Sequence, residues 1–280
     1  ARYYDPRTSV WQSPDPILVG YMGGRPAGGI YAPSNLNLYG YVKQHPVNAI
    51  DPNGKFTYDV RSGFLLDAGD TLSSISSSTG VSISDLVGAN PRIFSSMQPM
   101  VAGSSFNIPD NPNVLAFKAA AGRIGDREFM QSARYNDFFD AGVNKCNLFV
   151  ALNIRDGHDS FPTRIFDDQP VPALAGDWAK ANRSGMSAIS EQSAVIGDIV
   201  SWDRNWVARL ITRASGHTTT FASDLTVIDK FGQAYYPEGG AGTIGAGGGV
   251  GGVYRSADFL SANGFSWANA FFTRYFQPMD

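Results

Sequence analysis

The sequence of 280 residues contains one cysteine and three histidines. A single cysteine cannot close an intramolecular disulfide, so a disulfide framework and a cysteine-rich zinc site are both excluded. So few histidines also disfavour a metal site built from histidine and cysteine, and we expect neither a metal nor another cofactor. Any thiol nucleophile in this chain must be Cys146.

Charged residues are sparse as well, at 17% of the sequence. The formal net charge of -3 leaves no basic field to hold nucleic acid or an anionic membrane surface. No apolar run approaches the roughly 18 to 20 residues of a membrane span, and the N-terminus has no signal-peptide pattern. Because the chain starts without methionine in a strand-like stretch, we expect it to be part of a longer polypeptide.

Apolar residues make up 43% of the chain and glycine is abundant, with 31 residues. This composition and length predict a multidomain α+β protein with much β structure. Residues 1–56 are dense in Tyr, Pro, Gly and Asn, which indicates irregular β structure with tight turns. Residues 64–109 predict a strand, two short helices and a strand. Residues 113–280 are long enough to form an independent domain, with helices preceding an antiparallel sheet.

The cysteine lies in the stretch "NKCNLFV", at the start of a predicted helix. Unpaired N–H groups and the helix dipole favour a thiolate at that position, which suits a nucleophile. Phe149 and Val150 follow at helical spacing, so Cys146 shares the apolar face of this helix. An inert, buried cysteine is the alternative reading of the same pattern.

Among the histidines, His217 is the best partner for this thiol. His45 lies in the first segment, and His158 follows a helix end in a polar loop. In contrast, "SGHTTTFASDLTVIDKF" places His217 at the open end of a predicted β-hairpin.

With a turn at residues 222–224, this hairpin pairs Phe221 with Leu225 and His217 with Asp229. Asp229 is then the third catalytic residue, which orients the imidazole and stabilises its protonated form. A register shift of one residue would separate the pair.

The first segment resembles the end of the core of RHS-repeat proteins, through "ARYYDPRTSVWQSPDP" and "NLNLYGYVKQHPVNAIDPNG". In that family, repeats form a β shell around a C-terminal toxin, and an aspartate autoprotease closes the core. The resemblance implies autoproteolysis by Asp15 and Asp51, with cleavage near Lys55 and Phe56. Leu18 departs from the glycine expected in the first motif. The alternative is that both Asp-Pro pairs only form turns.

The second segment resembles a LysM domain through "GDTLSSISSSTGVSISDLVGANP". Such domains bind glycans that contain N-acetylglucosamine, usually peptidoglycan, in a shallow groove beside the first helix. The alternative is a small spacer whose groove no longer binds. The resemblance places five residues at the groove: Asp70, Thr71, Leu72, Asn90 and Pro91.

The third segment is similar to the papain-like NlpC and CHAP amidases over residues 140–231, through "NKCNLFV", "ALAGDWA", "GDIVSW" and "SGHTTTF". The resemblance implies Cys146 as nucleophile and His217 as base, with a weaker match for Asp229. It also implies that Asp177 with Trp178 and Asp198 with Trp202 lie near the cleft, the alternative being that these tryptophans belong to the core. The glycine-rich stretch from position 240 to 253 is expected to be a flexible loop.

Together these resemblances imply an antibacterial RHS effector that binds peptidoglycan and hydrolyses its stem-peptide amides. Its expected partners are peptidoglycan, a cognate immunity protein, the RHS shell and the spike components of a type VI secretion system. The producer would secrete it, and it would act in the periplasm of target bacteria. A protein-directed cysteine protease, deamidase or acyltransferase and a non-enzymatic peptidoglycan-binding adaptor remain as alternatives.

Overall fold

The computed structural model describes residues 4–5, 10–11, 56–67, 70–95, 100–129, 134–135, 139, 145–166, 169–203, 216–223, 225–235, 242–246, 253–254 and 269–276. The predicted self-cleaving residues Asp15 and Asp51 lie outside these ranges, as does Lys55 on one side of the expected cut. In the first segment, two short strands pair antiparallel, with Tyr4 opposite Trp11. These strands are β1 (Tyr4–Asp5) and β2 (Val10–Trp11).

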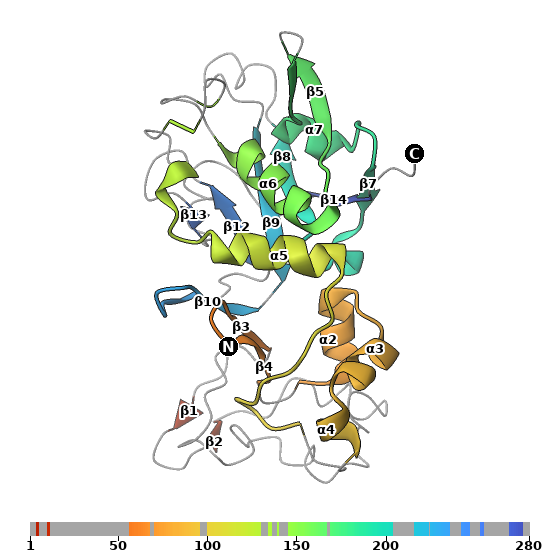
Figure 1. Ribbon diagram of the computed structural model, residues 1–280, viewed down its shortest axis with the longest axis vertical. Coiled ribbons are helices and arrows are strands. Elements are labelled where there is room, and N and C mark those ends of the chain that lie inside the picture. Colours follow the sequence, from red (N-terminus) through yellow and green to blue (C-terminus); the bar gives the residue numbers. More distant parts are fainter. Residues whose placement is uncertain are drawn as a thin grey trace.

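The described residues form an α+β structure, as predicted (Figure 1). The helices in chain order are α2 (Leu72–Thr79), α3 (Ile83–Ala89), α4 (Pro91–Ser95), α5 (Pro112–Gly122), η4 (Arg127–Phe129), α6 (Cys146–His158), α7 (Ala175–Lys180) and η5 (Glu191–Ser193), where η marks a 3-10 helix. The remaining strands are β3 (Thr57–Asp59), β4 (Gly63–Leu65), β5 (Thr163–Phe166), β6 (Gln169–Pro172), β7 (Met186–Ile189), β8 (Ile199–Asp203), β9 (Gly216–Ser223), β10 (Thr226–Ile228), β11 (Ala234–Tyr235), β12 (Gly242–Ala246), β13 (Val253–Tyr254) and β14 (Phe271–Tyr275).

Two larger sheets organise the described chain. The first is six-stranded and antiparallel, in the order β13-β12-β9-β8-β14-β7. The second is four-stranded, in the order β11-β10-β3-β4, and β10 runs parallel to β3. Strands β5 and β6 form a separate antiparallel pair.

Residues 64–106 contain the strand β4 and the two predicted helices α2 and α3, but a third helix, α4, follows them, and the expected second strand is reduced to a single bridge between Leu65 and Ser105. The N–H of Phe106 donates to the carbonyl of Phe64, and the N–H of Leu66 donates to the carbonyl of Ser104. Between these paired segments, α2 starts with a capping box in which Thr71 and Ser74 satisfy each other's backbone N–H groups. We call residues 64–106 the βααβ unit, after the paired segments at its two ends and the helices α2 and α3 between them.

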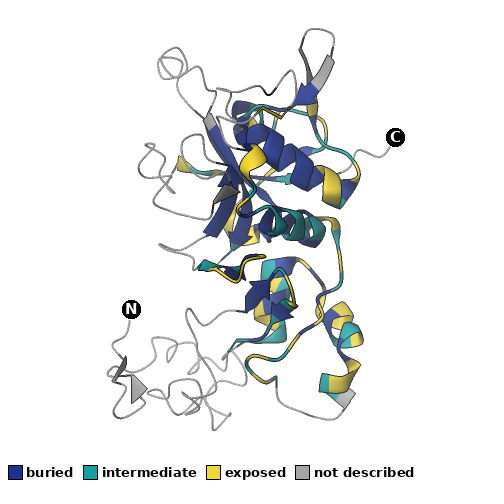
Figure 2. Ribbon diagram, turned by 60° about the vertical axis from the view of Figure 1, so that its left-hand side comes forward, coloured by how far each residue is buried: buried dark blue, intermediate teal, exposed yellow. Residues whose placement is uncertain are grey.

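The βααβ unit shares an apolar core with α5 and α6. The buried cluster includes Phe64 and Leu86 from the unit, Phe117 from α5 and Phe149 from α6. Figure 2 shows that these buried stretches continue from the four-stranded sheet into the helices above it. In addition, the N–H of Ile196 donates to a carbonyl at the end of α2 over 2.8 Å. The unit is therefore packed against its neighbours, which fixes its orientation.

The predicted hairpin between β9 and β10 is wrong. Strand β9 lies between β8 and β12, whereas β10 joins the other sheet beside β3. The chain turns sharply at Ser223, where φ is +49°, and Leu225 and Val227 become fully buried in the shared core. The alternation of apolar residues correctly indicates an apolar face on β10. The strand that pairs with β10 is β3, however, which is distant in the sequence.

The glycine-rich stretch is also corrected in part, because residues 242–246 form the buried strand β12. A Cβ atom at Gly245 would lie 2.6 Å from Cγ2 of Thr219 on the neighbouring β9. Glycine at this position therefore allows a close approach of side chains from β9, and the flexible-loop prediction fails for these five residues.

Candidate active site

The five predicted groove residues have structural roles in the βααβ unit. The side chain of Asp70 accepts a hydrogen bond from the N–H of Asp67 at 2.6 Å, and Thr71 caps α2. Leu72 packs against the core, and Pro91 is the first residue of α4. Asn90 is buried, and its amide bonds to the backbone of Asn107.

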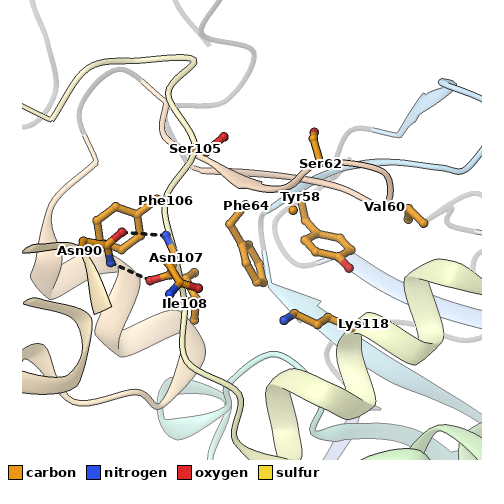
Figure 3. Close-up of a pocket in the computed structure, with 11 residues that line it drawn as sticks. Tyr58, Val60, Ser62, Phe64, Asn90, Ser105, Phe106, Asn107, Ile108 and Lys118 are labelled. Carbon is orange, nitrogen blue, oxygen red and sulfur yellow. Dashed lines mark hydrogen bonds between the residues drawn. The ribbon is translucent and has the colours of Figure 1, made fainter. Parts of the chain in front are cut away.

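Asn90 also lines a cavity of about 400 Å³ between the βααβ unit and α5 (Figure 3). Asp70, Thr71, Leu72 and Pro91 do not line it. Of the five predicted groove residues, Asn90 alone lines this cavity.

Cys146 is the first residue of α6 and is 7% exposed. The preceding residue, Lys145, makes no side-chain capping bond to the helix, and the first turn contains no acidic side chain. The positive end of the helix dipole at Cys146 is therefore not compensated by an acidic or capping side chain within α6. The sequence prediction of a helix-borne, buried thiol is confirmed.

Hydrogen bonds to Asn153 fix α6 on the six-stranded sheet. Asn153 is fully buried, and its Nδ2 donates to Oγ1 of Thr220 on β9 over 3.1 Å. Its Oδ1 accepts from Nη1 of Arg123 at 2.6 Å. The end of α6 lies near the end of β14, because the ring centroids of His158 and Tyr275 are 5.2 Å apart.

Strands β9 and β14 both run antiparallel to β8, so they run in the same direction. Because the end of α6 lies beside the end of β14, α6 also runs in this direction. From Asn153, Cys146 lies seven residues back along the helix, about 10 Å. From Thr220, His217 lies three residues back along the strand, again about 10 Å. Cys146 and His217 therefore lie at the same end of the helix and sheet layers.

The two side chains do not share a face of the sheet. Thr220 points toward α6, and the strand alternates without a register shift between β8 and β9, so His217 points away from α6. Its ring stacks on Trp202, with centroids 6.1 Å apart and an interplanar angle of 25°. Trp202 belongs to the second apolar cluster, with Val200 and Phe221. The direct contact predicted between Cys146 and His217 is thus not supported by the strand geometry.

Asp229 is not the partner of His217. It follows β10 in the four-stranded sheet, where its carboxylate accepts hydrogen bonds from the N–H groups of Phe231 and Gln233 and from the hydroxyl of Tyr235. Burial and the neighbouring Asp229 raise the pKa of Tyr235. These contacts hold the turn between β10 and β11, so the orienting role predicted for Asp229 is corrected to a structural one.

Asp177 and Asp198, both expected near a cleft, also hold the backbone. Asp177 accepts a hydrogen bond from the N–H of Leu174 and pairs with Arg183 at 3.2 Å. Asp198 is 1% exposed and precedes β8, at the end of the sheet opposite to His217. Trp202, four residues after Asp198, lies at the other end of β8 and stacks on His217.

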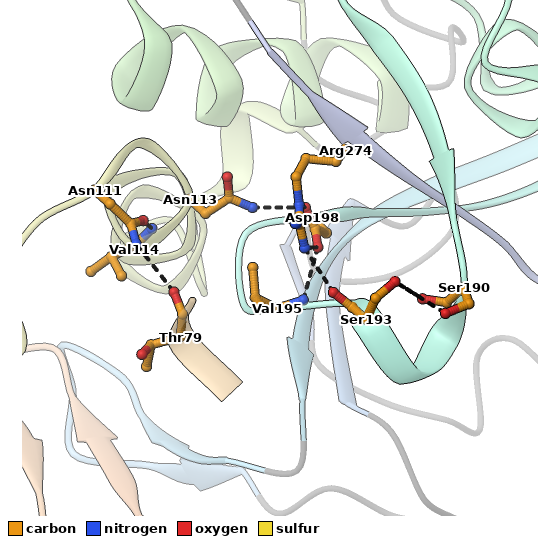
Figure 4. A network of polar contacts seen from close by, with 9 residues as sticks. All are labelled: Thr79, Asn111, Asn113, Val114, Ser190, Ser193, Val195, Asp198 and Arg274. Atoms are coloured by element: carbon orange, nitrogen blue, oxygen red, sulfur yellow. Dashed lines mark hydrogen bonds and ion pairs between the residues drawn. The ribbon is translucent and has the colours of Figure 1, made fainter. Parts of the chain in front are cut away.

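The carboxylate of Asp198 accepts four hydrogen bonds (Figure 4). Two come from Nε and Nη2 of Arg274, at 2.8 and 2.7 Å, and the others from the side chain of Asn113 and the N–H of Val195. A bidentate pair of this kind joins β14 to α5 and to the start of β8.

We therefore expect Asp198→Ala to lower the free energy of unfolding by about 3 to 5 kcal/mol, because it leaves the partly buried guanidinium of Arg274 unpaired. The matched variant Asp110→Ala removes an exposed carboxylate that pairs with Lys118, and should cost less than about 1 kcal/mol. Urea unfolding of both variants measures the difference. Equal losses would show that the Asp198 network contributes no more than a surface pair.

His158 is the last residue of α6, about 18 Å along the helix from Cys146, which excludes it as a base for that thiol. Burial lowers the pKa of His158 below its usual 6.5, and Asp198 opposes this shift. The unfolded chain then binds the proton more readily than the folded chain. Stability from this group is present above about pH 6.5 and is lost as the pH falls.

His158→Gln should therefore reduce the loss of thermal stability between pH 7.5 and pH 5. Melting temperatures of wild type and variant across this range test the prediction. An equal fall in melting temperature for the two proteins would contradict it, because groups other than His158 would then cause the acid sensitivity.

Two buried residues were not identified from the sequence: Lys145, which directly precedes α6, and Asn153, which lies within it. Lys145, next to Cys146, is 2% exposed and is among the largest fully buried side chains of the described chain. Asn153 is the polar residue that locks α6 to β9. Its position seven residues after Cys146, on the same helix face, is the signal that could have identified it.

The chain matches no family model, no curated protein and no solved structure. Its activity is therefore argued from its own residues. Within the described ranges, no cluster of three or more His, Cys, Asp or Glu side chains is placed to hold a metal ion. None of the helices in these ranges has the length and apolar character needed to cross a membrane.

Proposed function

We propose that this protein is an antibacterial RHS effector that hydrolyses stem-peptide amide bonds of peptidoglycan, with Cys146 as the nucleophile. The observation that carries the proposal is the position of the one thiol, at the uncapped start of a helix packed on an antiparallel sheet. His217 lies at the same end of that sheet. The resemblance to papain-like amidases rests on the same two residues.

In the proposed reaction the sulfur of Cys146 attacks the amide carbonyl carbon, forming a C–S bond. The C–N bond then breaks, and the leaving amine takes the proton that the base removed from the thiol. Water attacks the resulting thioester, and the products are a carboxylate and the regenerated thiol. In this proposal the N–H of Cys146, at the helix start, donates to the oxyanion as it forms.

For His217 to act as the base, its side chain must leave the stack with Trp202 and turn toward α6. His217 is the second residue of β9 and directly follows Gly216, so this turn involves only the start of the strand. Glycine permits the backbone conformations that such a turn needs. We propose that substrate binding selects this conformation.

The βααβ unit supplies the proposed attachment to the wall. Because it shares a core with α5 and α6, its orientation relative to Cys146 is fixed rather than set by a flexible linker. Binding of the same polymer would then hold a stem peptide near the thiol at high effective concentration. Secretion through a type VI system with an RHS shell, action in the periplasm of a rival and neutralisation by an immunity protein complete the proposal.

The test is to incubate purified sacculi with the protein and to analyse the released muropeptides by mass spectrometry. Amide hydrolysis adds one water per bond and exposes a new amine and a new carboxylate. New muropeptides of this kind are expected. Their absence, with a folded protein bound to the sacculi, would remove the hydrolase proposal.

The same assay tests a second function, a peptidoglycan-binding adaptor without enzymatic activity. The specific observation in its favour is that His217 packs on Trp202, on the face of the sheet away from α6. Binding to sacculi without cleavage would support the adaptor. Labelling of Cys146 by a thiol-reactive probe without cleavage of sacculi would instead favour a protein-directed cysteine enzyme.

A further inference from the structure

The cavity of about 400 Å³ lies where two segments of the chain stop pairing with each other. Leu65 is opposite Ser105 in an antiparallel bridge. The same register places residues 62–64 opposite residues 106–108. All six of these residues line the cavity (Figure 3). Two walls of the cavity are therefore segments that a continued ladder would join.

Pairing stops at Phe64 and Phe106. The N–H of Phe106 donates to the carbonyl of Phe64 at 2.9 Å, and in this register a regular ladder would also contain the reverse bond. The N–H of Phe64 points to the same side as its carbonyl, away from β3, and no acceptor among the described residues bonds to it. Because Phe64 is 4% exposed, this is a buried main-chain donor, of the kind that folded proteins normally satisfy.

Asn90 holds the second wall away from the first. Its side chain bonds to both the N–H and the carbonyl of Asn107, at 2.8 and 2.7 Å, and it also donates to the carbonyl of Leu86 in α3 at 2.8 Å. Main-chain groups of neighbouring residues alternate in direction, so these bonds hold Asn107 on the side opposite to β4. The separation of the two walls is therefore built into the fold, and a ligand between them needs little reorganisation.

Charge in the cavity is compensated. Lys118 is the one charged residue of the lining, and its Nζ pairs with Oδ1 of Asp110 at 2.5 Å. Burial, followed by the carboxylates of Asp110 and Asp59, raises the pKa of Tyr58 to about 12, so its hydroxyl stays neutral. The cavity therefore selects a ligand by hydrogen bonds to its walls rather than by charge.

We propose that this cavity binds a short extended peptide, which inserts between the two walls as an added strand. A peptide carbonyl accepts from the N–H of Phe64, and a peptide N–H donates to the carbonyl of Phe106, as in other cases of strand addition. Each wall is about three residues long, so a segment of about three residues matches it. The volume is near the lower end of the range of about 300 to 1,000 Å³ for small-molecule sites, which favours small side chains. The inference rests on the proposed function only for the natural source of the peptide, the stem peptide of peptidoglycan.

Amide NMR of the full chain, with Cys146→Ala to prevent turnover, tests the inference. The probe is acetyl-trialanine amide, and the matched probe carries an ester in place of the central amide, which removes one N–H. We expect the first probe to shift the amide signal of Phe64. The ester should bind about tenfold more weakly, because the carbonyl of Phe106 then lacks its donor.

Hydrogen exchange supplies a second measurement on the same protein. Without ligand, the amide proton of Phe64 should exchange faster than that of Leu66, which donates to the carbonyl of Ser104 at 2.9 Å. The peptide should slow the exchange of Phe64.

The matched variants address the bonds that hold the walls apart. Asn90→Ala removes them and should weaken peptide binding about tenfold, with circular dichroism as a check of folding. Asn107→Ala should bind as before, because Asn90 contacts the main chain at that position.

Three results would overturn the inference. The first is an amide signal of Phe64 that does not move with the peptide, and the second is equal affinity for the amide and ester probes. The third is a larger shift of the Phe64 signal with an N-acetylglucosamine tetramer, which would assign the cavity to the glycan. Because cleavage of sacculi is measured separately, a failure here leaves the proposed hydrolysis by Cys146 untouched, and the reverse also holds.

Discussion

Cys146→Ala is expected to abolish the release of muropeptides from sacculi, with a fall in rate of roughly a thousandfold or more. The physical reason is that the chain has no other thiol, so no covalent intermediate can form on sulfur. Replacing a small buried side chain by alanine at the first position of a helix should leave the fold intact. Muropeptide release per mole of protein, with circular dichroism as a check of folding, is the measurement.

Cys146→Ser is the matched control for shape. It retains a hydroxyl at the same helix start, but an alcohol is a far weaker nucleophile than a thiolate at neutral pH. Loss of activity in both variants, with wall binding preserved, is the expected pattern. If the alanine variant released muropeptides as fast as wild type, the thiol would be inert and the adaptor function would replace the hydrolase.

His217→Ala is expected to lower kcat/KM on sacculus fragments by about 10²- to 10⁴-fold, the usual contribution of a positioned general base. Rates of fragment hydrolysis at pH 7 measure the effect. The residue stacks on Trp202 in the resting structure, so this prediction depends on the turn at the start of β9.

His158→Ala is the control, since His158 ends α6 beside Tyr275, far from Cys146. Its kcat/KM should stay near the wild-type value at pH 7. If His217→Ala kept more than half of the wild-type rate, His217 would remain stacked on Trp202 in the working enzyme and would not act as the base. The base would then have to be another group, and the resemblance to papain-like amidases would be reduced to Cys146 alone.

Parts of the candidate site could be predicted because they depend on local sequence. The start of α6 at Cys146 follows from the change from polar to apolar residues in "NKCNLFV". The cap at Thr71 and the turn at Gly80 follow from side chains that satisfy helix ends within a few residues. Asn90 was expected at the groove through the resemblance to LysM domains, whereas its bonds to Asn107 join segments 17 residues apart.

The errors concern residues whose partners are distant in the sequence. The alternation in "HTTTFASDLTVI" is the same whether β10 pairs with β9 or with β3, so it could not reveal that Asp229 lies in the other sheet. Likewise, nothing local distinguishes a cleft carboxylate from Asp198, which binds Arg274, 76 residues away. Asp229, predicted to be catalytic, and Asp177 and Asp198, expected near the cleft, instead fix backbone and side chains.

The sequence by itself determined the α+β class, the helices α2 and α3 and a buried thiol at the start of a helix. Only the tertiary structure decided that β10 completes a sheet with β3, that His217 faces Trp202, and that Tyr58, Asn107 and Lys118 line one cavity. The reason is the range of the forces involved. Capping and periodicity act within a few residues, whereas strand pairing and the face of a sheet follow from burying apolar side chains brought together from the whole chain.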